Sequence, residues 1–184
     1  MKAVILHGTD NNHNGNWFPW LKDELENLDY EVWVPDLPKS ERPNLERYTK
    51  FLLSSGWDFK DNLIIGHSAG AVEILHLLEN LPKGTKAHTA IMVAVFKGDL
   101  GWEVLRDLAS VKYDFEKIKE NAKNIIVVHS DDDPHCPIEG AQEIAGELSA
   151  KMIVMHGMKH FSLHTDLRFD KFPELLGIIK NEVL

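Results

Sequence analysis

Short, mostly apolar runs alternate along the chain with stretches in which apolar residues recur every three or four positions. A short apolar run is typical of a strand buried on both faces, and the three-to-four spacing is typical of a helix with one apolar face. The runs predict six strands, at residues 3–6, 31–36, 63–65, 87–96, 124–128 and 152–155. The spaced patterns predict helices at residues 18–28, 45–53, 71–78, 137–148 and 172–183.

This alternation indicates an α/β fold with one parallel sheet and helices on both of its faces. Residues 97–122 hold two further short helical patterns and offer the only room for a lid. Because no repeat, low-complexity tract or linker interrupts the chain, we expect one domain over residues 1–184. Ligands of such sheets bind at the carboxyl ends of the strands, so catalytic residues are expected in the loops that follow them.

The loop after the third predicted strand has the sequence Gly66-His67-Ser68-Ala69-Gly70. A G-x-S-x-G pattern between a strand and a helix is typical of a sharp turn that presents a nucleophilic serine. The two glycines remove Cβ atoms that would collide with the strand and the helix. The alternative is a glycine-rich turn that only packs tightly or binds an anion at the helix N-terminus. We predict Ser68 as the nucleophile.

A serine hydroxyl needs a base, usually a histidine oriented by a carboxylate. Asp131, Asp132 and Asp133 follow the fifth predicted strand, and spacing hardly separates them as candidates for the carboxylate. Pro134 stiffens the chain directly after Asp133 and slightly favours it. The other two aspartates would then be turn residues.

Four histidines compete for the role of base: His67, His156, His160 and His164. His67 is expected to point away from its neighbour Ser68, and His156 is expected to pack at the end of the sixth strand. His160 lies further out, on a loop able to reach back over the sheet edge, so it is the preferred base. The chain order of serine, aspartate and histidine is the one that this fold type uses.

Backbone N–H groups are expected to stabilise the oxyanion of the intermediate. In this design one belongs to the residue after the nucleophile, here Ala69, and the other to the loop after the first strand. Thr9 is the preferred second donor, with Asp10 or a later residue as the alternative.

Several segments together resemble the YdeN-like, or retinoblastoma-binding-protein-nine-like, serine hydrolases, which are small α/β-hydrolases with a minimal lid. The resemblance implies a compact α/β-hydrolase fold of about six parallel strands, with Ser68 as nucleophile, Asp133 as triad acid and His160 as base. It is carried, in the family's order, by residues 2–8, 17–21, 64–70, 115–119, 130–134 and 160–161.

Two departures from the family pattern stand out. Lys159 precedes His160, where many relatives have glycine, so the loop geometry can differ here. The Leu-x-Cys-x-Glu motif that binds the retinoblastoma protein is absent, because Cys136 is followed by Pro137, Ile138 and Glu139. That partner is therefore not carried over.

Charge and composition narrow the partners and the location. The formal net charge is −9 without a basic cluster, which argues against nucleic acid and anionic lipid as partners. One cysteine cannot form an internal disulfide and suits a reducing compartment. Because no signal-peptide core and no membrane-spanning run is found, a cytoplasmic location is expected.

Metal and thiol chemistry have weaker support. His156, His160 and His164 are spaced four apart and would align on a helix, but Gly157 argues against a helix there. Neither an H-E-x-x-H motif nor a cysteine pair accompanies them. Cys136 lacks the strand–turn–helix setting of a nucleophile. We therefore predict no metal and no cofactor.

The resulting hypothesis is a serine hydrolase that cleaves small esters, and amides as a second class, through an acyl-enzyme. The short segment at residues 97–122 predicts a shallow or small acyl pocket suited to short-chain esters. The alternative is a non-catalytic protein of hydrolase fold that acts by binding a protein partner.

Overall fold

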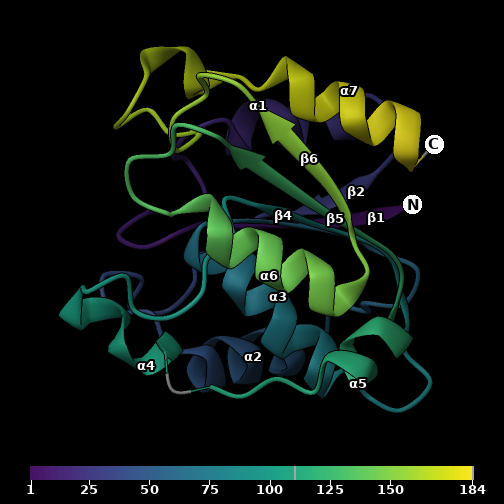
Figure 1. Ribbon diagram of the computed structural model, residues 1–184. Coiled ribbons are helices and arrows are strands. Elements are labelled where there is room, and N and C mark those ends of the chain that lie inside the picture. Colours follow the sequence, from purple (N-terminus) through teal and green to yellow (C-terminus); the bar gives the residue numbers. More distant parts are fainter. Residues whose placement is uncertain (110, 184) are drawn as a thin grey trace.

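A six-stranded, fully parallel sheet runs through the molecule in the computed structural model, which describes residues 1–109 and 111–183 (Figure 1). The strands lie in the order β2-β1-β3-β4-β5-β6. Their bounds are Lys2–Leu6 for β1, Glu31–Trp33 for β2, Leu63–His67 for β3, Ala87–Val93 for β4, Ala122–Ser130 for β5 and Lys151–Met155 for β6.

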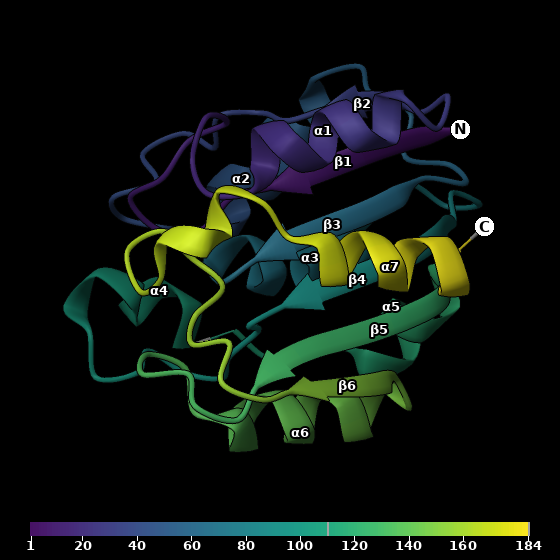
Figure 2. The same ribbon diagram turned by 90° about the horizontal axis from the view of Figure 1, so that it is seen from above.

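Helices cover both faces of this sheet, as Figures 1 and 2 show. One face carries α1 (Phe18–Glu26) and α7 (Pro173–Glu182), and the other carries α2 (Leu45–Ser54), α3 (Ala69–Asn80), α5 (Phe115–Glu120) and α6 (Ile138–Leu148). Between β4 and α5 lie two short helical turns, η1 (Glu103–Leu105) and α4 (Arg106–Ala109). A last turn, η2 (Leu167–Asp170), precedes α7.

The strands are apolar throughout because each buries both of its faces. In β1, Ala3 and Ile5 pack with the residues of α1 and α7, whereas Val4 and Leu6 pack with those of α2 and α3. All four side chains are fully buried. Burial of a large aliphatic side chain stabilises the fold by about 1.5–3 kcal/mol, so these central strands anchor the loops at their ends.

The predicted strands and helices are present, with shifts at several boundaries. β2 ends at Trp33 rather than at residue 36, and β4 ends at Val93 because the chain turns at Ala94, where φ is 52°. Ala122, read as the end of a helical pattern, instead begins β5. Residue 110 of the predicted lid segment lies outside the described residues, as does residue 184.

Within residues 1–109 and 111–183, every helix is too short or too polar to cross a membrane.

Candidate active site

The turn after β3 holds Ser68 in a strained conformation. Its φ of 54° and ψ of −121° lie where a residue with a side chain is rarely found. The Ser68 N–H donates to the Val93 carbonyl oxygen at 2.9 Å, and the Ser68 carbonyl accepts from Ala71 and Val72 as α3 begins. Strand, turn and helix therefore meet at one residue, as the G-x-S-x-G pattern predicted.

Close approach of the backbone explains the glycines around Ser68. A Cβ atom at Gly66 would lie 2.4 Å from the Gly70 carbonyl oxygen, and one at Gly70 would lie 2.4 Å from the Leu6 carbonyl oxygen. A Cβ atom at Gly8 would lie 3.0 Å from the Cβ of Ser68. The end of β1 and the start of α3 are thereby pressed together, and the loop after β1 lies against Ser68.

The carboxylate of Asp133 holds the imidazole of His160. His160 Nδ1 lies 2.7 Å from Asp133 Oδ2, while Asp133 Oδ1 accepts from the backbone N–H groups of His135 and Cys136 at 2.8 and 2.9 Å. Burial by itself raises the pKa of Asp133, but the hydrogen bonds and the interaction with His160 outweigh it and hold the pKa below its usual value. Asp133 is therefore ionised at neutral pH and fixes the orientation of His160.

The two neighbouring aspartates hold other parts of the same histidine loop. Asp131 accepts from His156 Nδ1 at 2.6 Å and from the Gly157 N–H at 3.1 Å. Asp132 accepts from the Lys159 N–H at 2.8 Å, and its other oxygen lies 3.1 Å from the Lys159 ammonium group. Both were expected to be turn residues, and both also tie the loop after β6 to the loop after β5.

The backbone around His160 is also fixed from the opposite side. Lys159 and Phe161 have φ values of 53° and 51°, so Lys159 takes the left-handed conformation that a glycine would adopt without strain. The Phe161 carbonyl accepts from Trp17 Nε1 at 3.0 Å.

His156 does not pack at the strand end as expected, because its side chain is 85% exposed.

His67, in the variable position of the G-x-S-x-G motif, supports the His160 loop. Its Nε2–H donates to the His160 carbonyl at 2.8 Å, and its ring contacts those of Trp17 and Phe18. Complete burial, reinforced by the nearby His160, lowers the pKa of His67 to about 3. His67 is therefore a neutral structural residue, a role that its sequence pattern did not predict.

The low pKa of His67 predicts a loss of stability in mild acid. The unfolded chain binds a proton at this histidine near pH 6.5, whereas the folded chain resists protonation down to about pH 3. Because the unfolded state then binds more protons, the free energy of unfolding should fall by about 2 kcal/mol between pH 7.5 and pH 5 through this residue alone.

Urea unfolding at the two pH values, in the wild type and in His67→Gln, measures this contribution. The variant should lose about 2 kcal/mol less than the wild type on acidification, whatever its stability at pH 7.5. Asn14→Gln is the matched control, because Asn14 is exposed and its amide does not titrate, and it should keep the wild-type pH dependence. Equal losses in His67→Gln and the wild type would contradict the prediction.

A cavity of about 360 Å³ lies at the carboxyl edge of the sheet and is lined by three of the predicted site residues, whereas Asp133 and Ala69 lie outside its lining. Ser68, His160 and Thr9 line it from three different loops. Within the described part of the chain, no acceptor is hydrogen-bonded to the backbone N–H of Thr9 or of Ala69. The rest of the cavity lining consists mainly of apolar side chains and histidine rings, and includes Phe96, Leu100, Trp102, Leu105, His135, Cys136 and His164.

Asp133, Cys136 and His160 are the described residues with the arrangement of metal ligands. Their potential ligand atoms lie within 4.8 Å of one another. However, Asp133 and His160 are hydrogen-bonded to each other, and burial raises the pKa of the Cys136 thiol. A metal ion would have to displace that hydrogen bond and a thiol proton, so the three residues suit an aspartate–histidine pair better.

Comparison with known proteins identifies the family. The profile described as serine hydrolase matches residues 3–181. The chain belongs to the serine hydrolase family. Among curated members, YdeN of Bacillus subtilis is 29% identical over 159 residues, which cover 85% of this chain and 84% of YdeN. The serine hydrolase RBBP9 of Rattus norvegicus is 28% identical over 185 residues, which cover 98% of this chain and 94% of that protein.

Solved structures of related proteins agree on the α/β-hydrolase fold. The crystal structure of the B. subtilis ydeN gene product matches with a TM-score of 0.90 and 25% identity, over 98% of this chain and 97% of the other. Est1E of Butyrivibrio proteoclasticus, solved with ferulic acid bound, matches with a TM-score of 0.71 and 15% identity, over 97% and 89%. The predicted family and fold are thus confirmed. At 15% identity, Est1E supports the fold alone.

Proposed function

We propose that this serine hydrolase cleaves small carboxylic esters through a Ser68–His160–Asp133 triad. The observation that carries the proposal is the Asp133–His160 pair, whose Oδ2 and Nδ1 atoms lie 2.7 Å apart, with His160 lining the same cavity as the strained Ser68. Since Asp133 accepts the proton on His160 Nδ1, the Nε2 atom of His160 is left unprotonated and able to act as a base.

In the first half of the reaction, His160 Nε2 takes the hydroxyl proton as Ser68 Oγ attacks the ester carbonyl. The oxyanion that forms accepts hydrogen bonds from the N–H groups of Ala69 and Thr9. When the tetrahedral intermediate collapses, the bond to the alcohol breaks and His160 returns its proton to the departing oxygen. The products of this half are the free alcohol and an acyl-Ser68 ester.

Water reverses the sequence in the second half. His160 removes a proton from the water, whose oxygen attacks the acyl carbonyl, and the proton then returns to Ser68 as the carboxylic acid leaves. Asp133 remains ionised and stabilises the imidazolium in both halves. Amides can follow the same route, but their poorer leaving group makes esters the proposed main substrates.

Labelling with a fluorophosphonate probe tests the assignment of Ser68. The wild type should be labelled covalently and should hydrolyse p-nitrophenyl butyrate, whereas Ser68→Ala should lose labelling and at least about 10³-fold in kcat. Peptide mapping should place the adduct on Ser68. A folded wild type with neither labelling nor ester turnover would instead favour a non-catalytic protein that binds a protein partner.

A further inference from the structure

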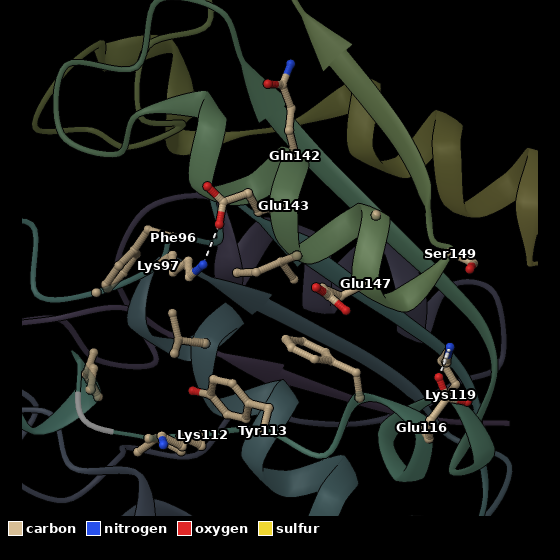
Figure 3. Close-up of a pocket in the computed structure, with 17 residues that line it drawn as sticks. Phe96, Lys97, Lys112, Tyr113, Glu116, Lys119, Gln142, Glu143, Glu147 and Ser149 are labelled. Carbon is tan, nitrogen blue, oxygen red and sulfur yellow. Dashed lines mark hydrogen bonds and ion pairs between the residues drawn. The ribbon is translucent and has the colours of Figure 1, made fainter.

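A second and larger cavity lies next to the catalytic one. It measures about 900 Å³ and runs between α6 and the segment that leads into α5 (Figure 3). In Figure 3, Phe96 and Lys97 lie at one end, and Glu116 and Lys119 lie at the other. No step of the proposed reaction takes place in this second cavity.

Part of the lining of this cavity is apolar. Val72, Leu108 and Ile144 contribute nearly buried aliphatic side chains from α3, α4 and α6. The half-buried rings of Tyr113 and Phe115 add to the same lining. An apolar ligand would gain the usual free energy of transfer from water here.

The charged residues around the cavity do not select a charged ligand. Three lysines are balanced by three glutamates: Lys97, Lys112 and Lys119 against Glu116, Glu143 and Glu147. Lys97 is ion-paired with Glu143, and Lys119 with Glu116 at 2.6 Å (Figure 3). Because the charges balance and partly pair with each other, they give no preference for a ligand of either sign.

Phe96 lies where the two cavities meet. Among the described residues it is the one that lines both, and its side chain is 2% exposed. It follows the turn at Ala94 and precedes Gly98, whose φ is 82°. Phe96 is therefore the described side chain shared by the space beside Ser68 and the larger cavity.

We propose that the second cavity receives the far end of a long acyl chain whose ester group lies at Ser68, with Phe96 as the gate between them. This inference rests on the proposed hydrolase function and extends its substrates from small esters to esters of longer, unbranched fatty acids. The catalytic cavity holds the ester and the first carbons, and the remaining methylene groups lie along Val72, Leu108 and Ile144.

Two substitutions test the proposal, one at the gate and one in the second cavity. The measured quantity is kcat/KM for p-nitrophenyl decanoate divided by kcat/KM for p-nitrophenyl butyrate. Phe96→Ala should raise this ratio about tenfold because it opens the passage, and Val111→Trp should lower it about tenfold because it fills the second cavity. Leu167→Ala is the matched control, since the exposed Leu167 lines neither cavity, and should change the ratio less than about threefold.

The outcomes separate this inference from the proposed function. If no ester is turned over and no fluorophosphonate adduct forms, the proposed hydrolase function is itself contradicted. If both esters are cleaved but Val111→Trp leaves the ratio unchanged, long chains do not enter the second cavity and the inference is overturned, whatever Phe96→Ala does. Thermal unfolding of each variant confirms that the protein measured is folded.

Discussion

Asp133→Asn is expected to lower kcat for p-nitrophenyl butyrate by about 10³–10⁴-fold. The Asp133 carboxylate accepts the His160 Nδ1 proton, whereas an asparagine can present its NH₂ group to the same nitrogen. The proton of His160 would then move to Nε2, the atom that must accept the Ser68 proton. The variant would keep the shape of the site but hold the imidazole in the wrong tautomer.

The two preceding aspartates provide matched controls for this prediction. Asp131→Asn and Asp132→Asn remove the same charge from the same loop, and their amide oxygens can still accept the backbone N–H bonds of Gly157 and Lys159. Each should reduce kcat less than about tenfold, because neither side chain contacts the His160 ring. A loss in Asp132→Asn as large as that in Asp133→Asn would show that the acid has been assigned to the wrong residue.

The Ser68 turn could be predicted from the sequence because its determinants are local. The strand, the two glycines and the helix that fix it all lie between Leu63 and Asn80. The strands could be predicted for a similar reason, since residues buried on both faces, as in β1 and β3, form continuous apolar runs. β2 was predicted too long because it pairs through three residues at the sheet edge, where sequence pattern is a weak guide.

Residue spacing could not predict which of the three aspartates contacts the His160 ring. All three contact the loop at residues 156–160, and each holds a different part of it. Such contacts depend on how two loops from neighbouring strands meet, which short-range patterns do not encode. The family resemblance pointed to Asp133, and the contact with His160 Nδ1 now gives that choice a physical basis.

The supporting role of His67 was missed for a related reason. Its position in G-x-S-x-G carries no residue requirement, so the pattern gives no hint that its Nε2–H donates to the His160 carbonyl. A polar residue at the end of a fully buried strand, directly before the buried start of a helix, was the available signal, because such a residue needs a hydrogen-bond partner. His67 thus links the nucleophile turn directly to the loop of the predicted base.

Gly70→Ala is expected to destabilise the fold by about 2–3 kcal/mol and to lower the unfolding midpoint by roughly 4–12 °C. The added Cβ would lie 2.4 Å from the Leu6 carbonyl oxygen and 2.5 Å from that of His7, both of them backbone atoms at the end of β1. Neither can move away without displacing a fully buried central strand. The first turn of α3 must then shift away from β1 and take Ser68 with it.

Gly177→Ala in α7 is the matched control for this clash, because nothing lies within 4 Å of the position that its Cβ would take. Replacement of a helical glycine by alanine at an open position should stabilise the protein by about 0.5–1 kcal/mol. Thermal unfolding of the two variants should therefore shift in opposite directions. An unchanged midpoint in Gly70→Ala would mean that β1 and α3 can separate freely, and that the glycine does not hold the nucleophile turn against the sheet.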